Sequence, residues 1–251
     1  MQPYIFLDLD DTLFQTLRKC TEEDHPRLQL RATLPDGTPN SFATHKQQWL
    51  WQWLAKDFKM VAVTARDFHA FERVDLPFQE EVVLNHGAVI LDRQRNVDAV
   101  WMVKMQRALP AYHEKLLAVW EAVKAHCAAD PGFRLRLVND FDMTWYGVIK
   151  HRLGTEAVLL PILQLIETHE HLMDGSLYWH LNGNNLAILP KIINKQDAVD
   201  YLIKNYKQQY PDILTIAAGD SKSDAAFMGL CDYAFIPTNT QLFKALAASV
   251  A

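Results

Sequence analysis

Cysteine is scarce in this chain of 251 residues, and its pattern excludes two kinds of covalent or metal-based stabilisation. The three cysteines, Cys20, Cys127 and Cys231, lie far apart, so none has a neighbour at the spacing of a zinc-binding motif. An odd number of cysteines is also unsuited to a disulfide framework. We therefore expect a reducing, cytoplasmic setting for this protein.

Long apolar runs and a basic charge are also missing. No segment approaches about 20 consecutive apolar residues, so we expect no membrane span. Residues 1–3 lack the basic region and apolar stretch that begin a signal peptide. The net charge of -5 argues against a general nucleic-acid binder, which carries a basic surface. We expect neither a membrane nor a nucleic acid as a partner, and the oligomeric state stays open.

What the chain does contain is typical of a globular protein. Hydrophobic residues make up 49% of the sequence and charged residues 22%. The length suffices for one large domain, or for a core domain with a smaller one inserted in it.

The most informative segment lies near the start, where an apolar run of strand length is followed at once by acidic residues. Asp8, Asp10 and Asp11 follow the run at residues 4–7 and would lie together at the tip of a sheet. Carboxylates crowded this closely repel one another unless they share a cation or a proton. The segment predicts a metal site with a carboxylate nucleophile beside it; a solvated turn or a helix N-cap is the competing interpretation.

The segments that follow predict alternating strands and helices. Residues 28–32 and 40–43 flank a turn and predict a small hairpin, either a flap near the site or a surface excursion. Residues 44–57 predict a helix whose Trp49 and Trp53 we assign to the core. Strands at 58–63 and 82–84 with a short helix between them predict a βαβ unit and hence a parallel sheet.

The middle of the chain has a different pattern. A helix at 109–128, two strands, a second helix and an Asn-Gly hairpin predict an α+β module. A helix and a buried strand then resume the first pattern at 196–218. We therefore expect a core domain from residues 1–88 and 189–251, with a cap domain inserted at 89–188.

Three strands of the expected core end in polar residues. Asp8 and Asp10 follow the first strand, Thr64 follows the second, and Asp220 and Asp224 follow the strand at 213–218. In an open parallel sheet the ligand site lies at the carboxyl ends of the strands. These residues are therefore expected to converge, which favours a catalytic site over a solvated rim.

The same positions resemble the motifs of the haloacid dehalogenase (HAD) superfamily. The first motif, DxDxT, is matched by Asp8, Asp10 and Thr12, and the second by Thr64. Lys195 stands where the lysine of the third motif is expected, with Lys191 as its competitor. The fourth motif is matched by the remaining acidic pair, Asp220 and Asp224.

The order of the motifs resembles one branch of that superfamily, in which a large α/β cap lies between the second and third motifs. That branch includes sucrose-phosphate, mannosylphosphoglycerate and Cof-type phosphatases. The resemblance implies an α/β fold: a Rossmann-like HAD core with a parallel sheet and an inserted α+β cap. Two positions depart from the branch, since Ser223 and His86 stand where an asparagine is usual.

The resemblance also implies a Mg²⁺-dependent phosphomonoesterase that acts on a small phosphorylated metabolite, such as a sugar phosphate. Asp8 would be the nucleophile that forms an aspartyl-phosphate, and Asp10 the acid and base. Thr64 and Lys195 would hold the phosphoryl group. The expected metal ligands are Asp8, Asp10 through its carbonyl, Asp220 and Asp224.

Two alternatives stay open: a phosphomutase on the same core, and a non-catalytic phosphate-binding or regulatory protein. Substrate choice is expected to lie in the cap. Its polar and aromatic candidates are Arg134, Arg136, Trp145, Lys150, His151, Arg152, Trp179, His180, Asn182 and Asn184.

Overall fold

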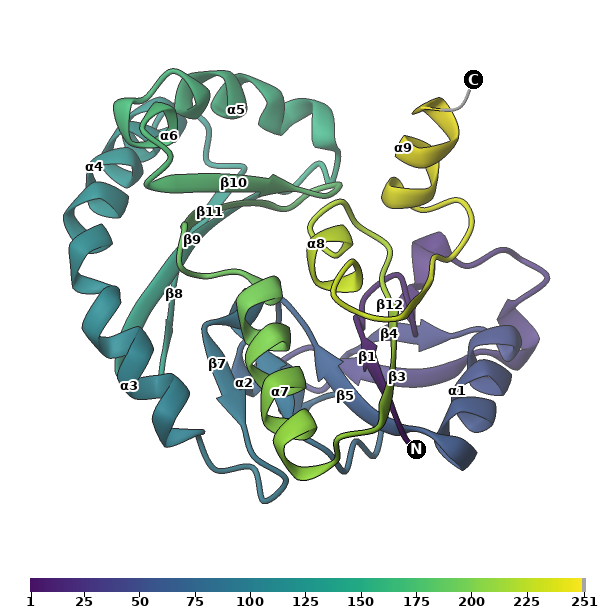
Figure 1. The fold of residues 1–251 in the computed structure, drawn as a ribbon. Helices are drawn as coiled ribbons and strands as arrows, with labels where there is room; N and C mark the ends of the chain where they lie inside the picture. The colour runs from purple at the N-terminus through teal and green to yellow at the C-terminus, as the bar shows by residue number, and fades with distance from the viewer. Residues whose placement is uncertain (250–251) are drawn as a thin grey trace. The chain divides into compact units, whose positions relative to one another are not determined.

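The structure is a computed structural model that describes residues 1–249 (Figure 1). Its contacts divide the chain into two units. The core unit comprises Met1–Asp98 and Asn194–Ala251, and the inserted unit comprises Ala99–Ile193. These boundaries differ from the expected 88/89 and 188/189. At the first of them, residues 89–91 form a strand that pairs within the core sheet.

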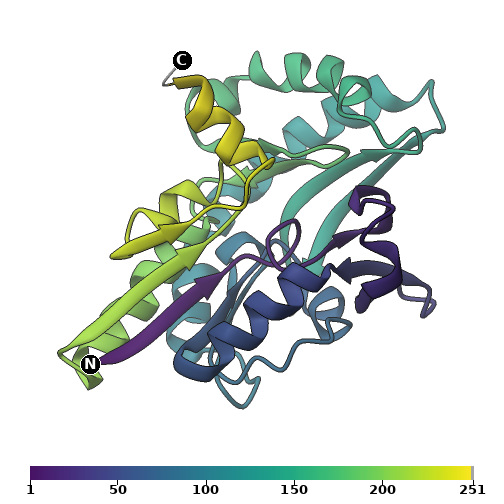
Figure 2. The same ribbon diagram turned by 90° about the vertical axis from the view of Figure 1, so that its right-hand side faces the viewer.

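The core unit is built on a six-stranded sheet. In spatial order its strands are β13 (Tyr233–Phe235), β12 (Ile213–Ala218), β1 (Gln2–Leu7), β5 (Lys59–Val63), β6 (Val82–Leu84) and β7 (Val89–Leu91). All neighbours pair in parallel except β6 and β7, which are antiparallel. Figure 2 shows β1 and β12 side by side. The predicted parallel sheet is therefore confirmed, with one antiparallel edge strand.

Apolar side chains bury both faces of the central strand β1, as expected of a parallel sheet covered by helices. The helices of the core unit are α1 (His45–Asp57), α2 (Phe68–Glu72), α7 (Lys195–Gln209), α8 (Ala225–Met228) and α9 (Gln241–Ser249). Tyr206 of α7 stacks on Tyr4, with 4.1 Å between ring centroids. Figures 1 and 2 place α7 and α1 on opposite faces of the sheet.

Helix α1 begins where the sequence predicted, but the assignment of Trp49 and Trp53 to the core is wrong. Trp49 and Trp53 are 61% and 41% exposed, and their rings stack on each other. The buried side of the helix instead carries Trp51 and Leu54. Both pairs recur at helical spacing, so periodicity alone did not tell which stripe faces the sheet.

A small antiparallel sheet follows the first acidic segment. It contains β2 (Gln15–Thr16), β4 (Pro39–Ala43) and β3 (Gln29–Thr33), in that spatial order. The predicted hairpin is confirmed as β3 and β4. Single turns of 3₁₀ helix connect the segments of the core unit: η1 (Leu17–Lys19), η2 (His25–Arg27) and η3 (Asn85–Gly87).

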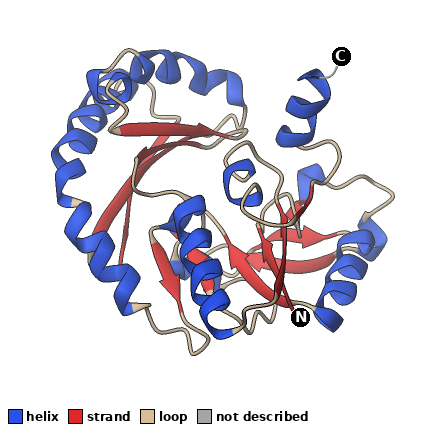
Figure 3. Ribbon diagram, in the orientation of Figure 1, coloured by secondary structure: helices blue, strands red, loops and turns tan. Residues whose placement is uncertain are grey.

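The inserted unit is the expected α+β module. Its elements are α3 (Ala99–Ala108), α4 (Pro110–Cys127), β8 (Phe133–Asp140), β9 (Met143–His151), η4 (Glu156–Leu159), α5 (Leu160–Glu167), α6 (Glu170–Met173), β10 (Leu177–Leu181) and β11 (Leu186–Pro190). The four strands form an antiparallel sheet in the order β10-β11-β9-β8. Figure 3 shows helices along one side of this sheet, where side chains of α4 and α5 form a core with Ile149, Leu186 and Ile188.

Among the residues that the structure describes, no helix combines the length and the apolar character that crossing a membrane requires. The three cysteines are free thiols.

The capping box of α1 gives a test of local stability. Thr44 accepts a hydrogen bond from Gln47 N, and the Gln47 side chain accepts one from Thr44 N at 2.9 Å. Removing this cap leaves backbone N–H groups unsatisfied, so Thr44→Ala should lower the free energy of unfolding by about 1 kcal/mol in urea titrations. Thr155→Ala is the control, because Thr155 is an exposed N-cap residue whose side chain makes no capping hydrogen bond. Equal stability of the two variants would contradict this account.

Candidate active site

The sheet brings the predicted strand ends together. Leu7 of β1 pairs with Ala218 of β12 on one side and with Ala62 of β5 on the other. The residues that follow these strands therefore leave the sheet at the same edge. Asp8 N donates a hydrogen bond to Ala218 O at 2.9 Å, which holds the start of the acidic loop against β12.

Three of the predicted carboxylates form one buried cluster. Asp8, Asp220 and Asp224 each offer an oxygen within 4.8 Å of the others, and all three residues are buried. Such a group requires cations or protons nearby, because burial removes the water that would screen the repulsion. The cluster joins the first and fourth motifs, which lie more than 200 residues apart in sequence.

The Lys195 ammonium lies inside this cluster. Its Nζ donates hydrogen bonds to Asp8 Oδ1 and to Asp224 Oδ1, each at 2.6 Å. Lys195 is the first residue of α7, where a positive charge runs against the helix dipole. The lysine therefore gains its stabilisation from the carboxylates and not from the helix. Its competitor Lys191 is exposed and belongs to the inserted unit.

The single positive charge of the Lys195 ammonium does not balance the negative charges of three carboxylates. Burial raises the pKa of Asp8 well above its usual value, although Lys195 opposes this shift. Burial, with the Asp224 charge next, raises the pKa of Asp220 to about 7. Burial opposes ionisation of Asp224 as well, but Lys195 and the Ser221 hydrogen bonds lower the pKa of that carboxyl. The cluster is thus short of positive charge on its Asp8 and Asp220 side.

The loop that holds Asp224 is a dense hydrogen-bond network. Asp224 Oδ2 accepts from Ser221 N at 2.9 Å and from Ser221 Oγ at 2.6 Å. Ser223, the departure noted in the sequence, lies with its Oγ 2.8 Å from Ser221 Oγ and so extends this network. At Gly219 a Cβ atom would lie 2.5 Å from that of Asp224, so only glycine allows this close approach.

Asp10 lies outside the buried cluster. Its side chain is 49% exposed and makes two hydrogen bonds with Arg66, from Nε at 2.7 Å and from Nη2 at 2.8 Å. A two-point contact of this kind sets the orientation of a carboxylate. Sequence reasoning missed Arg66, although an arginine two residues after Thr64 was the available signal.

The two threonines of the motifs are both buried. Thr12 Oγ1 donates to Asp8 Oδ2 at 3.3 Å. Thr64 Oγ1 accepts from Arg66 N at 3.1 Å, so the same loop carries both the second-motif hydroxyl and the arginine. Asp11 has a positive φ of 65° and forms an ion pair with Lys19 of η1.

The cap candidates fall on two sides of the inserted sheet. Trp145 and His151 are buried and structural: Trp145 Nε1 donates to Asp140 O at 2.9 Å, and His151 contacts Asp130. Strand alternation places a second set on the face opposite the apolar core. That set consists of Arg134, Arg136, Lys150 and His180.

Among the remaining cap candidates, Trp179 shares the core-covered face with Ile188, with which it pairs across β10 and β11. Asn184 is part of the structure of its hairpin: its Oδ1 accepts from His151 N at 2.9 Å, and its Nδ2 donates to His151 O at 2.7 Å.

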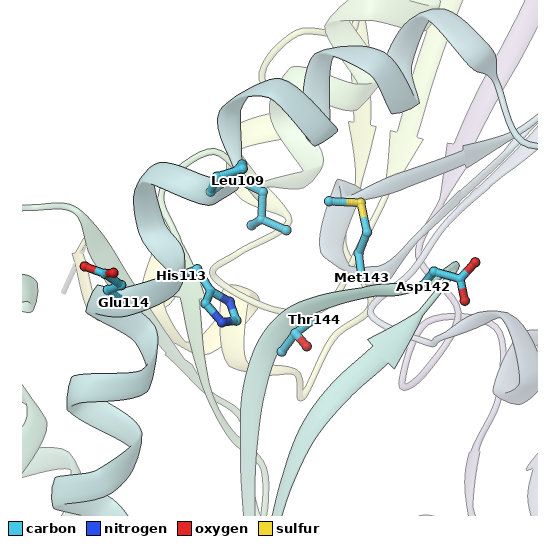
Figure 4. A pocket seen from close by; sticks show the side chains of 7 residues that line it. Leu109, His113, Glu114, Asp142, Met143 and Thr144 are labelled. Carbon is cyan, nitrogen blue, oxygen red and sulfur yellow. The ribbon is translucent and has the colours of Figure 1, made fainter.

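The inserted unit also has a pocket of about 340 Å³ that the sequence did not suggest. Figure 4 shows it between the junction of α3 and α4 and the tip of the β8–β9 hairpin. Its lining residues are Leu109, Pro110, His113, Glu114, Asp142, Met143 and Thr144. It contains none of the predicted catalytic residues.

Comparison with known proteins finds similarity to phosphatases. The model of the family sucrose-6F-phosphate phosphohydrolase matches residues 138–241. A curated relative, the glucosyl-3-phosphoglycerate/mannosyl-3-phosphoglycerate phosphatase of Methanococcoides burtonii, is 36% identical over 62 residues. That match covers 25% of this chain and 20% of the relative, so the chain spans only about a fifth of the relative's length.

Two solved structures resemble the whole chain. The C-terminal domain of trehalose-6-phosphate phosphatase from C. albicans has a TM-score of 0.60 and 14% identity, covering 91% of this chain and 73% of that one. The chain has the fold of the HAD phosphatases. The sucrose-phosphatase of Synechocystis sp., solved with sucrose and phosphate, has a TM-score of 0.51 and 13% identity, covering 100% and 98% of the two chains. The resemblance to the HAD superfamily is thus confirmed, and the relatives named above are phosphatases.

The shortage of positive charge in the cluster predicts opposite effects for two similar substitutions. Asp220→Asn removes one repelling charge and should raise the free energy of unfolding by about 1 kcal/mol at pH 8 with a chelator present, since one pKa unit is worth about 1.4 kcal/mol. Asp224→Asn breaks the contact with Lys195 and should lower it by about 3 kcal/mol. Urea titrations measure both, and destabilisation by Asp220→Asn would contradict this charge balance.

Proposed function

We propose that this protein is a Mg²⁺-dependent phosphomonoesterase that hydrolyses a small phosphorylated metabolite through an aspartyl-phosphate on Asp8. One observation carries the proposal. Buried carboxylates and the Lys195 ammonium meet at the carboxyl ends of parallel strands, and a second carboxylate, Asp10, stays exposed two residues beyond Asp8. Binding alone does not require both a buried nucleophile and a separate acid.

The donor set fits Mg²⁺. This ion prefers oxygen ligands and keeps several waters, and every donor in the cluster is an oxygen. Asp8 and Asp220 would hold the ion together with the Asp10 carbonyl, and Asp224 would support them. When bound, the ion neutralises charge between the nucleophile and the phosphoryl group.

The first half of the reaction uses Asp8 and Asp10. An Asp8 carboxylate oxygen attacks phosphorus in line, and the bond from phosphorus to the leaving oxygen breaks. Asp10 gives its proton to that leaving oxygen. The Lys195 ammonium and the Thr64 hydroxyl stabilise the charge on the phosphoryl oxygens.

The second half releases phosphate. Asp10, now ionised, takes a proton from a water molecule that attacks the same phosphorus. The bond between Asp8 and phosphorus breaks, which returns the free carboxylate. Arg66 holds Asp10 in one orientation through its two hydrogen bonds.

We propose a sugar phosphate as the substrate class. The names of the relatives found by sequence and by fold specify phosphorylated sugars or glycosyl-phosphoglycerates. Within the inserted unit, Arg134 and Lys150 stand directly opposite each other on neighbouring strands. Two neighbouring positive charges support a role in binding a polar or anionic substrate.

The proposal predicts metal-dependent release of phosphate. The purified chain with Mg²⁺ should release inorganic phosphate from members of a sugar-phosphate panel, and a chelator should stop it. Asp8→Asn should abolish release because an amide oxygen is a poor nucleophile, while Thr38→Ala should behave as the unsubstituted chain does. Full activity in Asp8→Asn would contradict the proposal. Transfer of the phosphoryl group to a second hydroxyl, without release of phosphate, would indicate a mutase.

The acid role of Asp10 predicts a dependence on the leaving group. Asp10→Asn should lower kcat for a sugar phosphate by about 10²–10⁴-fold, since the leaving alkoxide needs a proton. An aryl phosphate has a better leaving group, so the first-turnover burst of aryl alcohol should fall much less. Rapid-quench measurements compare the two, and equal losses would contradict the assigned role.

A further inference from the structure

A strained turn lies beside the third-motif lysine. Asn85, His86 and Gly87 of η3 have positive φ angles of 51°, 57° and 102°, and all three residues are buried. Residues other than glycine rarely adopt this conformation, and strain of this kind persists only where the surroundings enforce it. The turn is therefore held in place by its contacts.

The turn contacts two parts of the proposed site. On one side, Asn85 N donates to Arg66 O at 2.9 Å and His86 N donates to Thr64 O at 3.1 Å. On the other side, Gly87 packs against the backbone of Asn194. A Cβ atom on Gly87 would lie 2.1 Å from Asn194 O and 2.6 Å from Asn194 C.

Asn194 is the residue through which this contact reaches Lys195. It caps α7, its Oδ1 accepting from Asp197 N at 2.7 Å, and it is the first core residue after the inserted unit. Lys195 follows it directly, and the Lys195 backbone N would lie 3.1 Å from the added Cβ. The contact thus holds the chain at its return into the core, one residue before the ammonium that binds Asp8.

We propose that Gly87 is a positioning residue that sets the location of Lys195 relative to Asp8 and Asp224. Any side chain at position 87 pushes the Asn194 backbone away by roughly an ångström, and a displacement of that size at an active site costs about 10²-fold in rate. The inference deepens the proposed function, and its kinetic part rests on that function.

The test compares two glycines that both have a positive φ. Gly87→Ala and Gly175→Ala both place alanine at a positive φ, 102° and 71°, but at Gly175 nothing lies within 4 Å of the added Cβ. Gly87→Ala should lower kcat by about 10²-fold. Gly175→Ala should leave kcat unchanged and report the stability cost of alanine at a positive φ without a steric clash. Unchanged kcat in Gly87→Ala would overturn the proposal.

A double-mutant cycle that combines Gly87→Ala with Lys195→Met distinguishes a positioning role of Gly87 from a general loss of stability. If Gly87 acts through Lys195, Gly87→Ala should cause no further loss of kcat in the Lys195→Met background. The same cycle can be measured on the free energy of unfolding. Gly87→Ala should destabilise the protein less in the Lys195→Met background, where the Lys195 ion pairs are absent. Independent effects of the two substitutions in both measurements would overturn the proposal.

The unfolding cycle decides the matter even if the chain releases no phosphate from any substrate, because it needs no activity. Asn194→Ala covers the case in which Gly87→Ala does not fold. It removes the hydrogen bond to Asp197 and loosens the same backbone without overpacking it. Its effects on kcat and on unfolding should likewise shrink in the Lys195→Met background, and effects of full size there would refute the positioning role.

Discussion

The ion pairs between Lys195 and two buried carboxylates are the interactions on which the rest of the site depends. They bring the first, third and fourth motifs into direct contact at 2.6 Å. Burying these groups is costly, and the cost is offset only because each carboxylate also accepts other hydrogen bonds. The cluster nevertheless holds more negative than positive charge, which makes it a place where a cation is stabilised.

The fold supplies the rigid support that such a cluster needs. Residues 4–7 of strand β1 are fully buried between neighbouring strands, so Asp8 leaves the sheet at a defined point. Helix α7 packs on the sheet through Tyr206 and presents Lys195 from its first turn. The turn at Asn85–Gly87 closes the space between the second motif and α7. The site is therefore held by backbone contacts on several sides, as precise positioning requires.

Much of this architecture could be predicted from the sequence. The strand at 213–218 and the helix at 44–57 follow the expected ranges within a residue, because apolar periodicity and turn residues mark their ends clearly. The short edge strand β7 and helix α3 were not predicted. Such short or weakly patterned segments take their structure from neighbours that lie far away in sequence.

For the site, the sequence by itself determined which residues we propose for the chemistry: carboxylates after two strands, a hydroxyl after a third, and a lysine at a helix start. It did so because polar residues directly after apolar, strand-length runs can be recognised in the sequence. Only the tertiary structure decided that Arg66 binds Asp10, that Trp49 and Trp53 face outward, and that Gly87 lies against Asn194. These are contacts between segments distant in sequence, so packing geometry determines them and local pattern does not.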